Sequence, residues 1–502
     1  MKLNPFKKLL TTVTLIGAMT ALLGCSQSEA SSKLEGTPEH PYTIIWYMIG
    51  TPQADQEMVM DKLNEYLIQK IGAKVELHII DWGSYDQKMN VVTISGQPYD
   101  IAFTSSWANS YTKKAQLGAF YPLDDLLQKY GQGIIQNVPQ IFLDGAKVNG
   151  ELYAIPTNKE VGRQVVYRVN YPVLQSVGMK MSQFKADADL ETLRSMEPFL
   201  KAVKHQRKDI LPYAVFGNTT YVAANLDIIL GELPGAVHIR NSDYKVLNQY
   251  EESEFTDFYG VYRDFYKKGY IPSNAAQIDD DPSLVTTGKW ALGNAEFQPF
   301  ADNLWSKSAG YTIKSVPAFQ PVITNAQLQG SMMAISINAR RPDIDMKFLN
   351  LINSDRYVRN LIGSGIEGVH YKYVGKDRIK YLPSHSAYDM PGFAYGNLFM
   401  TNLLDGDPAD KWQQFESWNA TAIKSPLLGF NFDTRPVSAE IAAITSVLAQ
   451  YKKGLATGQS DPKVYLPLML RDLKTAGSDK LIAEEQRQIN VWRAKSSASA
   501  AK

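Results

Sequence analysis

Strand and helix patterns alternate near the start of the chain. Tyr42 to Met48 is β-branched and aromatic, like a buried strand, and Asp55 to Ile71 carries apolar residues at helical spacing. A second strand over 74–80, a second helix over 85–94 and a third strand over 99–103 follow. This βαβαβ order predicts a parallel sheet with right-handed crossovers, which binds ligands at the carboxyl ends of its strands.

The rest of the chain predicts a second α/β region and then helices. Strands are expected over 152–156, 163–169, 213–216, near Trp290 and over 331–337, and a helix over 189–204. Apolar residues recur at helical spacing from Val437 to Tyr451 and from Leu481 to Trp492. We predict an α/β protein with two lobes joined by several chain crossings and a helical C-terminal region. The expected division is about 42–150 plus 285–345 for the first lobe, about 151–284 plus 346–425 for the second, and 426–502 for the C-terminal domain.

The N-terminus carries a secretion signal pattern. Three lysines precede an apolar run from Leu9 to Leu23, which is too short to cross a bilayer core of ~30 Å but suits a signal peptide. Leu22, Gly24 and Cys25, the only cysteine, resemble the lipobox of bacterial lipoproteins. We expect 1–24 to be removed, Cys25 to be lipidated and 25–41 to form a flexible tether. An ordinary signal peptide with a chance cysteine is the alternative.

Charge, cysteine count and missing motifs remove several function classes. The chain has 502 residues and a net charge of +1, so no basic field favours nucleic acid. One cysteine allows neither an internal disulfide nor a zinc site built on several thiolates. The sequence also lacks the serine-hydrolase elbow, the His-Glu-x-x-His pair and the phosphate-binding loop. We therefore expect no catalytic residue, metal or cofactor.

One glycine-rich segment resembles a dinucleotide motif in the wrong context. Gly363 to Gly368 matches Gly-x-Gly-x-x-Gly, but a helix is expected before it, over 355–362, and a strand after it, over 369–374. The order is the reverse of a dinucleotide site, so the segment is predicted to be a turn at a helix end. Such a turn can present polar side chains to a ligand, here Glu367, His370 and Tyr371.

Two other conspicuous groups are expected to be structural. One is the aromatic stripe formed by Phe255, Phe258, Tyr259, Tyr262, Phe265 and Tyr266, whose spacing places it on one helix face and predicts core packing. The other is the acidic run Asp279 to Asp281, which lacks the spaced oxygen ligands of a calcium loop. It is predicted to form a solvated turn before Pro282.

Aromatic residues in predicted loops are the better ligand candidates. Asp81 and Trp82 follow the second strand, and Trp107 follows the third. A tryptophan face matches the apolar face of a pyranose, and a nearby carboxylate can bind its hydroxyls. Equally, either ring could close the sheet edge. Glu160 and Arg163 lie where the chain first passes between the lobes. They are expected either to contact the ligand or to form a surface ion pair.

The sequence resembles the extracellular solute-binding lipoproteins of ABC sugar importers, especially a large Gram-positive group found in Paenibacillus-like bacteria. The resemblance rests on the lipobox, on Gly96 to Ile101, on Gly150 to Pro156 and on Ser425 to Phe430. In that group the pattern at Gly429 to Val437 opens a C-terminal domain of unknown function.

The resemblance implies a type II periplasmic-binding-protein-like fold with a hinge between its lobes. Its members hold an oligosaccharide between the lobes and deliver it unchanged to permease subunits in the membrane. For this chain it implies a monomer, lipid-anchored through Cys25 on the extracellular face of the cell membrane. A surface-anchored glycoside hydrolase and a peptide-binding importer protein remain alternatives.

Overall fold

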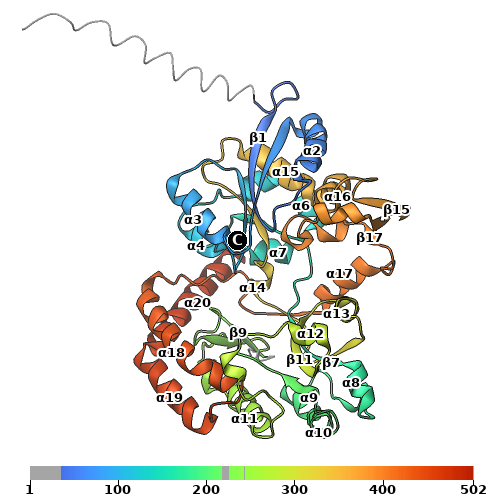
Figure 1. Cartoon of the computed structure of the whole chain (residues 1–502). Helices are drawn as coiled ribbons and strands as arrows, with labels where there is room; N and C mark the ends of the chain where they lie inside the picture. Colours follow the sequence, from blue (N-terminus) through green and yellow to red (C-terminus); the bar gives the residue numbers. More distant parts are fainter. Residues whose placement is uncertain (1–34, 218–224, 242, 501–502) are drawn as a thin grey trace, which may run out of the picture.

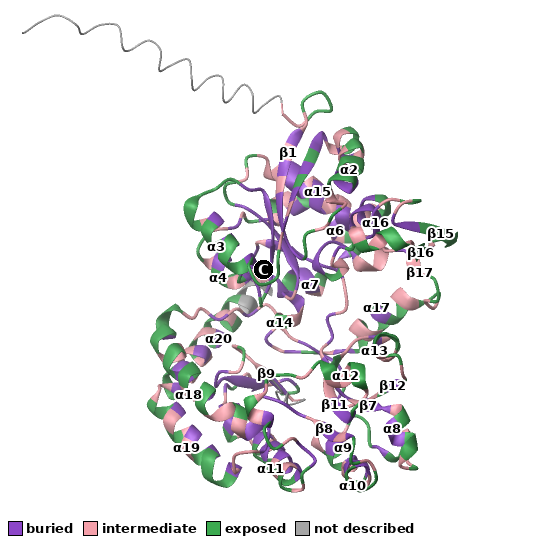
Figure 2. Ribbon diagram, viewed as in Figure 1, coloured by how far each residue is buried: buried purple, intermediate pink, exposed green. Residues whose placement is uncertain are grey.

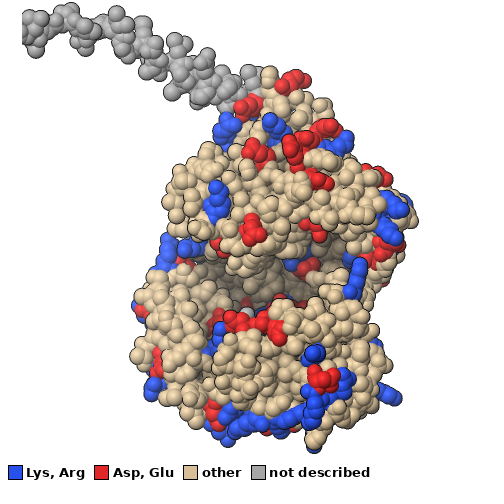
Figure 3. Space-filling view, viewed as in Figure 1, with Lys and Arg blue, Asp and Glu red and all other residues tan. Residues whose placement is uncertain are grey.

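The computed structural model describes residues 35–217, 225–241 and 243–500, which form two lobes with a hollow between them (Figures 1 and 3). The predicted signal segment, Cys25 and the tether up to residue 34 lie outside the described residues. From residue 35 the predicted tether packs on the first lobe, where Arg340 lies 3.3 Å from Glu35. Within the described part of the chain, no helix is both long and apolar enough to cross a membrane.

The first lobe is built on a five-stranded mixed sheet. Its strand order is β2 (Ala73–Ile80), β1 (Tyr42–Ile49), β3 (Ile101–Thr104), β14 (Met332–Ile335) and β6 (Ala154–Pro156). β1 pairs in parallel with β2 and β3, which confirms the predicted βαβαβ unit, whereas β14 runs antiparallel to β3 and β6. The intervening helices are α2 (Gln56–Ile71) and α3 (Tyr85–Ser95).

Helices complete the first lobe and cover its sheet (Figure 2). Trp46 on β1 is buried and meets Phe348 of α15 edge to face, at a centroid separation of 5.4 Å. The remaining elements of this lobe are α4 (Tyr111–Gln116), α5 (Asp124–Tyr130), α6 (Gln132–Asn137), α7 (Gln140–Gly145), β4 (Lys147–Val148), β5 (Glu151–Leu152), α15 (Pro342–Ser354), α16 (Arg356–Ser364), β15 (Tyr371–Gly375), β16 (Arg378–Tyr381) and β17 (Leu403–Leu404).

The second lobe has its own four-stranded sheet and core. The strand order is β12 (Ile313–Pro317), β7 (Gln164–Asn170), β11 (Trp290–Phe297) and β8 (Leu211–Ala214). Around it lie α8 (Tyr171–Ser176), α9 (Leu190–Ser195), α10 (Glu197–Gln206), β9 (Leu226–Ile228), β10 (Ala236–His238), α11 (Ser253–Lys267), α12 (Ser283–Thr287) and α13 (Ala301–Ala309). The aromatic stripe on α11 packs into this core as predicted, with only Tyr266 partly exposed.

The lobes divide differently from the sequence-based expectation. Residues 290–317 were expected in the first lobe, but β11 and β12 both pair with β7 of the second sheet. Residues 346–395 were expected in the second lobe, but apolar side chains of α15, α16 and the following loops pack into the first core. The hydrophobic pattern identified these strands and helices without specifying the neighbours on which they pack.

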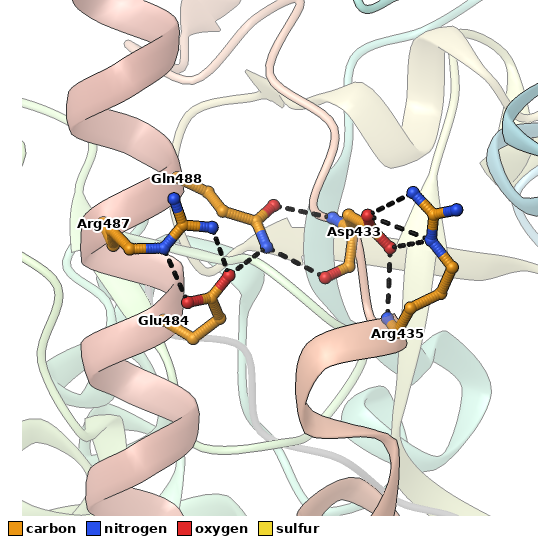
Figure 4. A network of polar contacts seen from close by, with 5 residues as sticks. All are labelled: Asp433, Arg435, Glu484, Arg487 and Gln488. Atoms are coloured by element: carbon orange, nitrogen blue, oxygen red, sulfur yellow. Dashed lines mark hydrogen bonds and ion pairs between the residues drawn. The ribbon is translucent and has the colours of Figure 1, made fainter.

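The C-terminal helices belong to the second lobe rather than to a separate core. α18 (Ser438–Ala456), α19 (Pro462–Thr475) and α20 (Ser478–Ala500) bury apolar residues against it. A polar network joins α20 to the segment before α18 (Figure 4). Gln488 bonds the backbone N–H and C=O of Asp433, Arg435 pairs with Asp433, and Arg487 pairs with Glu484.

Three crossings lie side by side between the lobes and form the hinge. Arg163 and Val322 exchange backbone hydrogen bonds of 2.7 and 2.9 Å. β13 (Val322–Ile323) pairs in parallel with β18 (Ile423–Lys424), just after α17 (Lys411–Thr421) and beside α14 (Asn325–Leu328). The predicted multi-crossing connection is therefore present, and lobe movement must be accommodated in or beside these three strands.

Candidate functional site

A cavity of about 460 Å³ lies between the lobes, directly against the hinge. The space-filling view shows this hollow between the two bodies (Figure 3). The first lobe contributes Ser106, Trp107, Gly330, Ser331 and Phe393; the first crossing contributes Lys159, Glu160, Val161, Gly162 and Arg163; and the second lobe contributes Glu296, Phe297, Gln298, Ala301, Leu304 and Trp305. Its size and its mixture of aromatic and polar side chains are typical of a small-molecule site.

Trp107 is the aromatic wall that the first lobe supplies. It follows β3 at the sheet edge and its side chain is 52% exposed. The indole Nε1 donates to the carbonyl of Gly330 at 2.7 Å, and the Ser105 hydroxyl accepts from the backbone N–H of Trp107 at 3.2 Å. Trp82 stacks on Trp107 and on Phe393, with centroid separations of 6.3 and 6.1 Å. These contacts hold an exposed ring in one orientation.

The second lobe supplies facing aromatic residues that sequence reasoning missed. Phe297 ends β11, Gln298 follows it, and Trp305 lies on α13. Phe297 meets Trp305 edge to face at 6.4 Å, and the Arg168 guanidinium lies 5.3 Å from the Trp305 ring centroid. The end of a strand is the signal that had identified Trp107, and it would also have identified Phe297. No sequence signal separates Trp305 from a packing residue of an amphipathic helix.

Arg163 forms an ion pair and lines three cavities. Arg163 Nε lies 2.8 Å from Glu296 Oε1. Arg163 lines the interlobe cavity, a second cavity of about 320 Å³ beside Asp227 and Tyr259, and a third of about 710 Å³ beside Arg168 and Asp279 to Asp281.

The acidic run at the third cavity forms the exposed turn expected from the sequence. Asp281 Oδ1 accepts from the Ser283 backbone N–H at 3.1 Å, and Asp279 pairs with Lys453 at 2.5 Å. Among the residues that the structure describes, no three His, Cys, Asp or Glu side chains are grouped so that they could hold a metal ion. Asp280 and Asp281 line the third cavity beside the ion pair of Asp279 with Lys453.

The first crossing is braced against α17. Asn419 accepts from the Val161 N–H at 2.9 Å and donates to the Lys159 carbonyl at 2.8 Å. Lys159 Nζ lies 3.2 Å from Glu160 Oε1, and both side chains are mostly buried. Glu160 and Arg163, both predicted from the sequence, thus line the cavity while each is engaged in an ion pair.

Asp227 is the buried acid nearest the hinge. Burial raises its pKa to about 6, although a hydrogen bond from the Ser425 hydroxyl and the charge of Arg163 lower it. Ser425 follows β18, the third crossing. Asp227 therefore links the second lobe to the hinge, and we assign it a structural role rather than a contact with the ligand.

Asp81 and Trp82 do not line the interlobe cavity. Asp81 Oδ1 accepts from the Gly83 N–H at 3.1 Å and so shapes the turn after β2. Trp82 is 42% exposed, and its ring stacks on both Trp107 and Phe393, which do line the cavity. Trp82 is therefore a positioning residue, and Asp81 lies outside the candidate site.

The predicted contacts Glu367, His370 and Tyr371 also lie away from this cavity. The glycine-rich turn does follow a helix end, since Gly365 has a φ of +78° directly after α16. His370 is fully buried, however: its Nδ1 accepts from the Ile366 N–H at 2.9 Å, and its Nε2 lies 3.2 Å from Asp55 Oδ2. Tyr371 is buried as well, Glu367 is exposed, and none of the three side chains lines the interlobe cavity.

We expect His370→Gln to lower the free energy of unfolding by about 1 kcal/mol, since one of the two buried polar contacts of His370, with the Ile366 N–H and with Asp55, is lost. Ligand affinity is expected to stay unchanged. Denaturant unfolding and calorimetric titration measure the two effects, with His78→Gln on β2 as a control at a more exposed histidine. Weaker ligand binding with an unchanged free energy of unfolding would show that His370 contributes to the binding site.

Comparisons with known proteins agree with this architecture. A carbohydrate ABC transporter substrate-binding protein of Streptococcus pneumoniae is 27% identical over 488 residues, covering 96% of this chain and 97% of that protein. The crystal structure of an N-glycan transport solute binding protein, NgtS, from Streptococcus pneumoniae has a TM-score of 0.81 at 27% identity, covering 89% of this chain and 98% of that one. The same protein in complex with Man5GlcNAc has a TM-score of 0.69. The predicted type II two-lobed fold is confirmed.

Family models match both parts of the chain. A domain of unknown function, DUF3502, matches residues 426–494, the region that the sequence predicted to form the C-terminal domain. The model of the bacterial extracellular solute-binding proteins matches residues 50–359, more than half of the chain and most of both sheets. The chain belongs to the bacterial extracellular solute-binding proteins.

Proposed function

We propose that this protein captures an oligosaccharide between its lobes for an ABC importer. The observation that carries the proposal is the cavity at the hinge, with Trp107 on one lobe and Phe297 and Trp305 on the other. Rings that approach from opposite sides can contact both apolar faces of a pyranose. The relative described as a carbohydrate ABC transporter substrate-binding protein and the glycan-bound neighbour support the same class of ligand.

The three cavities that share Arg163 as a lining residue favour several sugar units over one. Together they offer the Arg163 and Glu296 ion pair, the Lys159 and Glu160 pair, and the amide of Gln298 as partners for hydroxyl groups. The charges come in opposite pairs, which suits a neutral ligand because hydroxyls can donate to the carboxylates and accept from the cations. No bond in the ligand has to break for this function.

Ligand-driven closure is energetically feasible. A shift from 1:99 to 99:1 in favour of the closed form requires about 5.5 kcal/mol of differential affinity. Micromolar binding corresponds to about 8 kcal/mol in total. Ordinary affinity is therefore enough if most of it arises from contacts made only when the lobes meet, such as those of Phe297 and Trp305 opposite Trp107.

The cellular context of the proposal comes from the N-terminal sequence and the family. Lipidation of Cys25 would hold the protein on the extracellular face of the cell membrane, where two or more acyl chains give stable anchoring. We propose that the closed, monomeric protein hands its ligand to permease subunits. Mass spectrometry of the membrane-extracted protein tests the anchor through the mass of its N-terminal peptide.

A thermal-shift screen of the protein with residues 1–25 removed, followed by calorimetric titration, tests the ligand class. The panel contains chito-oligosaccharides, manno-oligosaccharides, Man1GlcNAc, Man5GlcNAc, peptides and amino acids. We expect at least one oligosaccharide to raise the melting temperature and to be recovered intact. Stabilisation by peptides alone would contradict the proposal, and so would cleavage of the sugar, which the hydrolase alternative predicts.

A further inference from the structure

A fourth hollow, of about 770 Å³, opens on the first lobe and shares Ser106 and Trp107 with the interlobe cavity. It is bounded by α3, by the loop after β3, by α4 and by the segment after β14, and all its lining residues belong to the first lobe. Figure 1 shows α3 and α4 next to each other in the upper body. Because one lobe forms the whole groove, hinge closure leaves its shape unchanged.

The groove displays an unusual amount of apolar surface to solvent. Ile94 is 86% exposed, Leu117 66% and Ile337 46%. Asn90 and Asn338 line the same groove, and their amides can donate to and accept from hydroxyl groups. Solvent-facing apolar side chains interspersed with amides match a sugar ring, which has apolar C–H faces and a polar rim. A purely apolar groove would not offer this combination.

Trp107 connects the groove to the interlobe cavity. Trp107 and Ser106 line both spaces, so the two hollows share one wall. The hydrogen bond from Trp107 Nε1 to Gly330 holds the ring at that boundary. A saccharide chain that leaves the cleft past Trp107 would therefore reach the groove at this shared wall.

We infer that this groove is an accessory subsite, which binds the outer units of an oligosaccharide whose inner units lie between the lobes. The inference rests on the proposed function and extends it, because it assigns this protein a ligand longer than the cleft alone can hold. The shared wall at Trp107 favours a saccharide over a protein segment as the occupant. A long ligand thus gains contacts in the groove that do not depend on closure. A short ligand does not reach these contacts.

Ile94→Ser and Asn90→Ala, combined in one variant, test the subsite. Both side chains are exposed, so folding is expected to be unaffected. Calorimetry with Man1GlcNAc and Man5GlcNAc, and with chito- and manno-oligosaccharides of two to six units, compares short and long ligands. In whichever saccharide series binds the native protein, we expect the variant to bind the long members about fivefold more weakly. The affinity for the short members is expected to be unchanged. The matched control combines Val91→Ser and Gln87→Ala, which alter exposed positions of α3 outside the groove.

The outcomes separate this inference from the proposed function. If the groove variant binds long saccharides as tightly as the native protein does, the inference of an accessory subsite is wrong while the proposed function stands. If no saccharide binds the native protein, both fail. If the groove variant binds every saccharide normally but no longer associates with a second copy or with permease subunits, the groove is a protein-docking surface and the inference is overturned.

Discussion

Replacing Trp107 by alanine is expected to weaken oligosaccharide binding by at least tenfold. The ring is the exposed aromatic wall of the first lobe, and it also borders the groove on α3. Alanine removes the stacking face and frees the carbonyl of Gly330. Buried aromatic anchors at binding sites commonly contribute about 2 kcal/mol or more, which corresponds to a loss of roughly thirtyfold. Calorimetric titration with the saccharide identified by the screen measures the loss.

Two further variants separate ring loss from damage to the fold. Trp107→Phe keeps an aromatic face but cannot donate to Gly330, so we expect it to retain more affinity than Trp107→Ala. Tyr465→Ala removes a 43% exposed aromatic side chain from α19 and is expected to leave binding unchanged. Unaltered affinity in Trp107→Ala, with cooperative unfolding retained, would assign the ring to closing the sheet edge.

Part of this site follows from local sequence and part does not. Trp107 was predictable because the third strand was recognisable and a parallel sheet gathers ligand contacts at its carboxyl edge. Glu160 and Arg163 were predictable from the first passage between lobes. Phe393 and Trp305 reach the cavity only through tertiary packing, one through a loop of the first lobe and the other through α13 of the second. The inward fold of the turn at His370 likewise depends on Asp55, which is distant in sequence.

The fold shows the same division between local and long-range information. β1, α2, β2 and α3 lie within one or two residues of their predicted bounds, because each can be recognised from its own residues, β1 as a continuous β-branched and aromatic run. The positions of β11 and β12 were also visible as apolar strands. Their partner was not, because the pairing of both with β7 depends on how the chain returns after about 120 residues for β11 and about 140 for β12.

Replacing Glu485 by glutamine is expected to stabilise the protein at neutral pH. Glu485 lies on α20, is fully buried and has no hydrogen-bond partner for either carboxylate oxygen among the described residues. Its carboxylate lies against the backbone at Gly235, where even a Cβ atom would collide with it. Burial raises the pKa of Glu485 to about 9 from an ordinary value of 4.5.

The raised pKa fixes the sign of the pH dependence. Between pH 4.5 and about 9 the folded protein keeps a proton that the unfolded chain has lost, so the contribution of Glu485 to stability falls as the pH rises. The slope is about 1.4 kcal/mol per pH unit, or roughly 3 kcal/mol between pH 5.5 and 7.5. Glu485→Gln removes this loss, so its advantage in urea unfolding should be large at pH 7.5 and small at pH 5. An equal difference at both pH values would show that Glu485 is ionised in the folded protein.

The adjacent Glu484 supplies a control of opposite sign. Hydrogen bonds from Arg487 lower the pKa of Glu484, so its contribution to stability is present above its ordinary pKa and is lost as the pH falls (Figure 4). Glu484→Gln should therefore destabilise the protein at pH 7.5, and only slightly because Arg487 is 60% exposed and water screens the pair. The effect should be smaller in acid, where the Glu484 carboxylate is protonated. Both substitutions remove a carboxylate from the same turn of α20, so a general effect of charge on the helix would move both variants in one direction. Opposite shifts at pH 7.5 can arise only from the different surroundings of the two side chains, buried against Gly235 in one case and paired with Arg487 in the other.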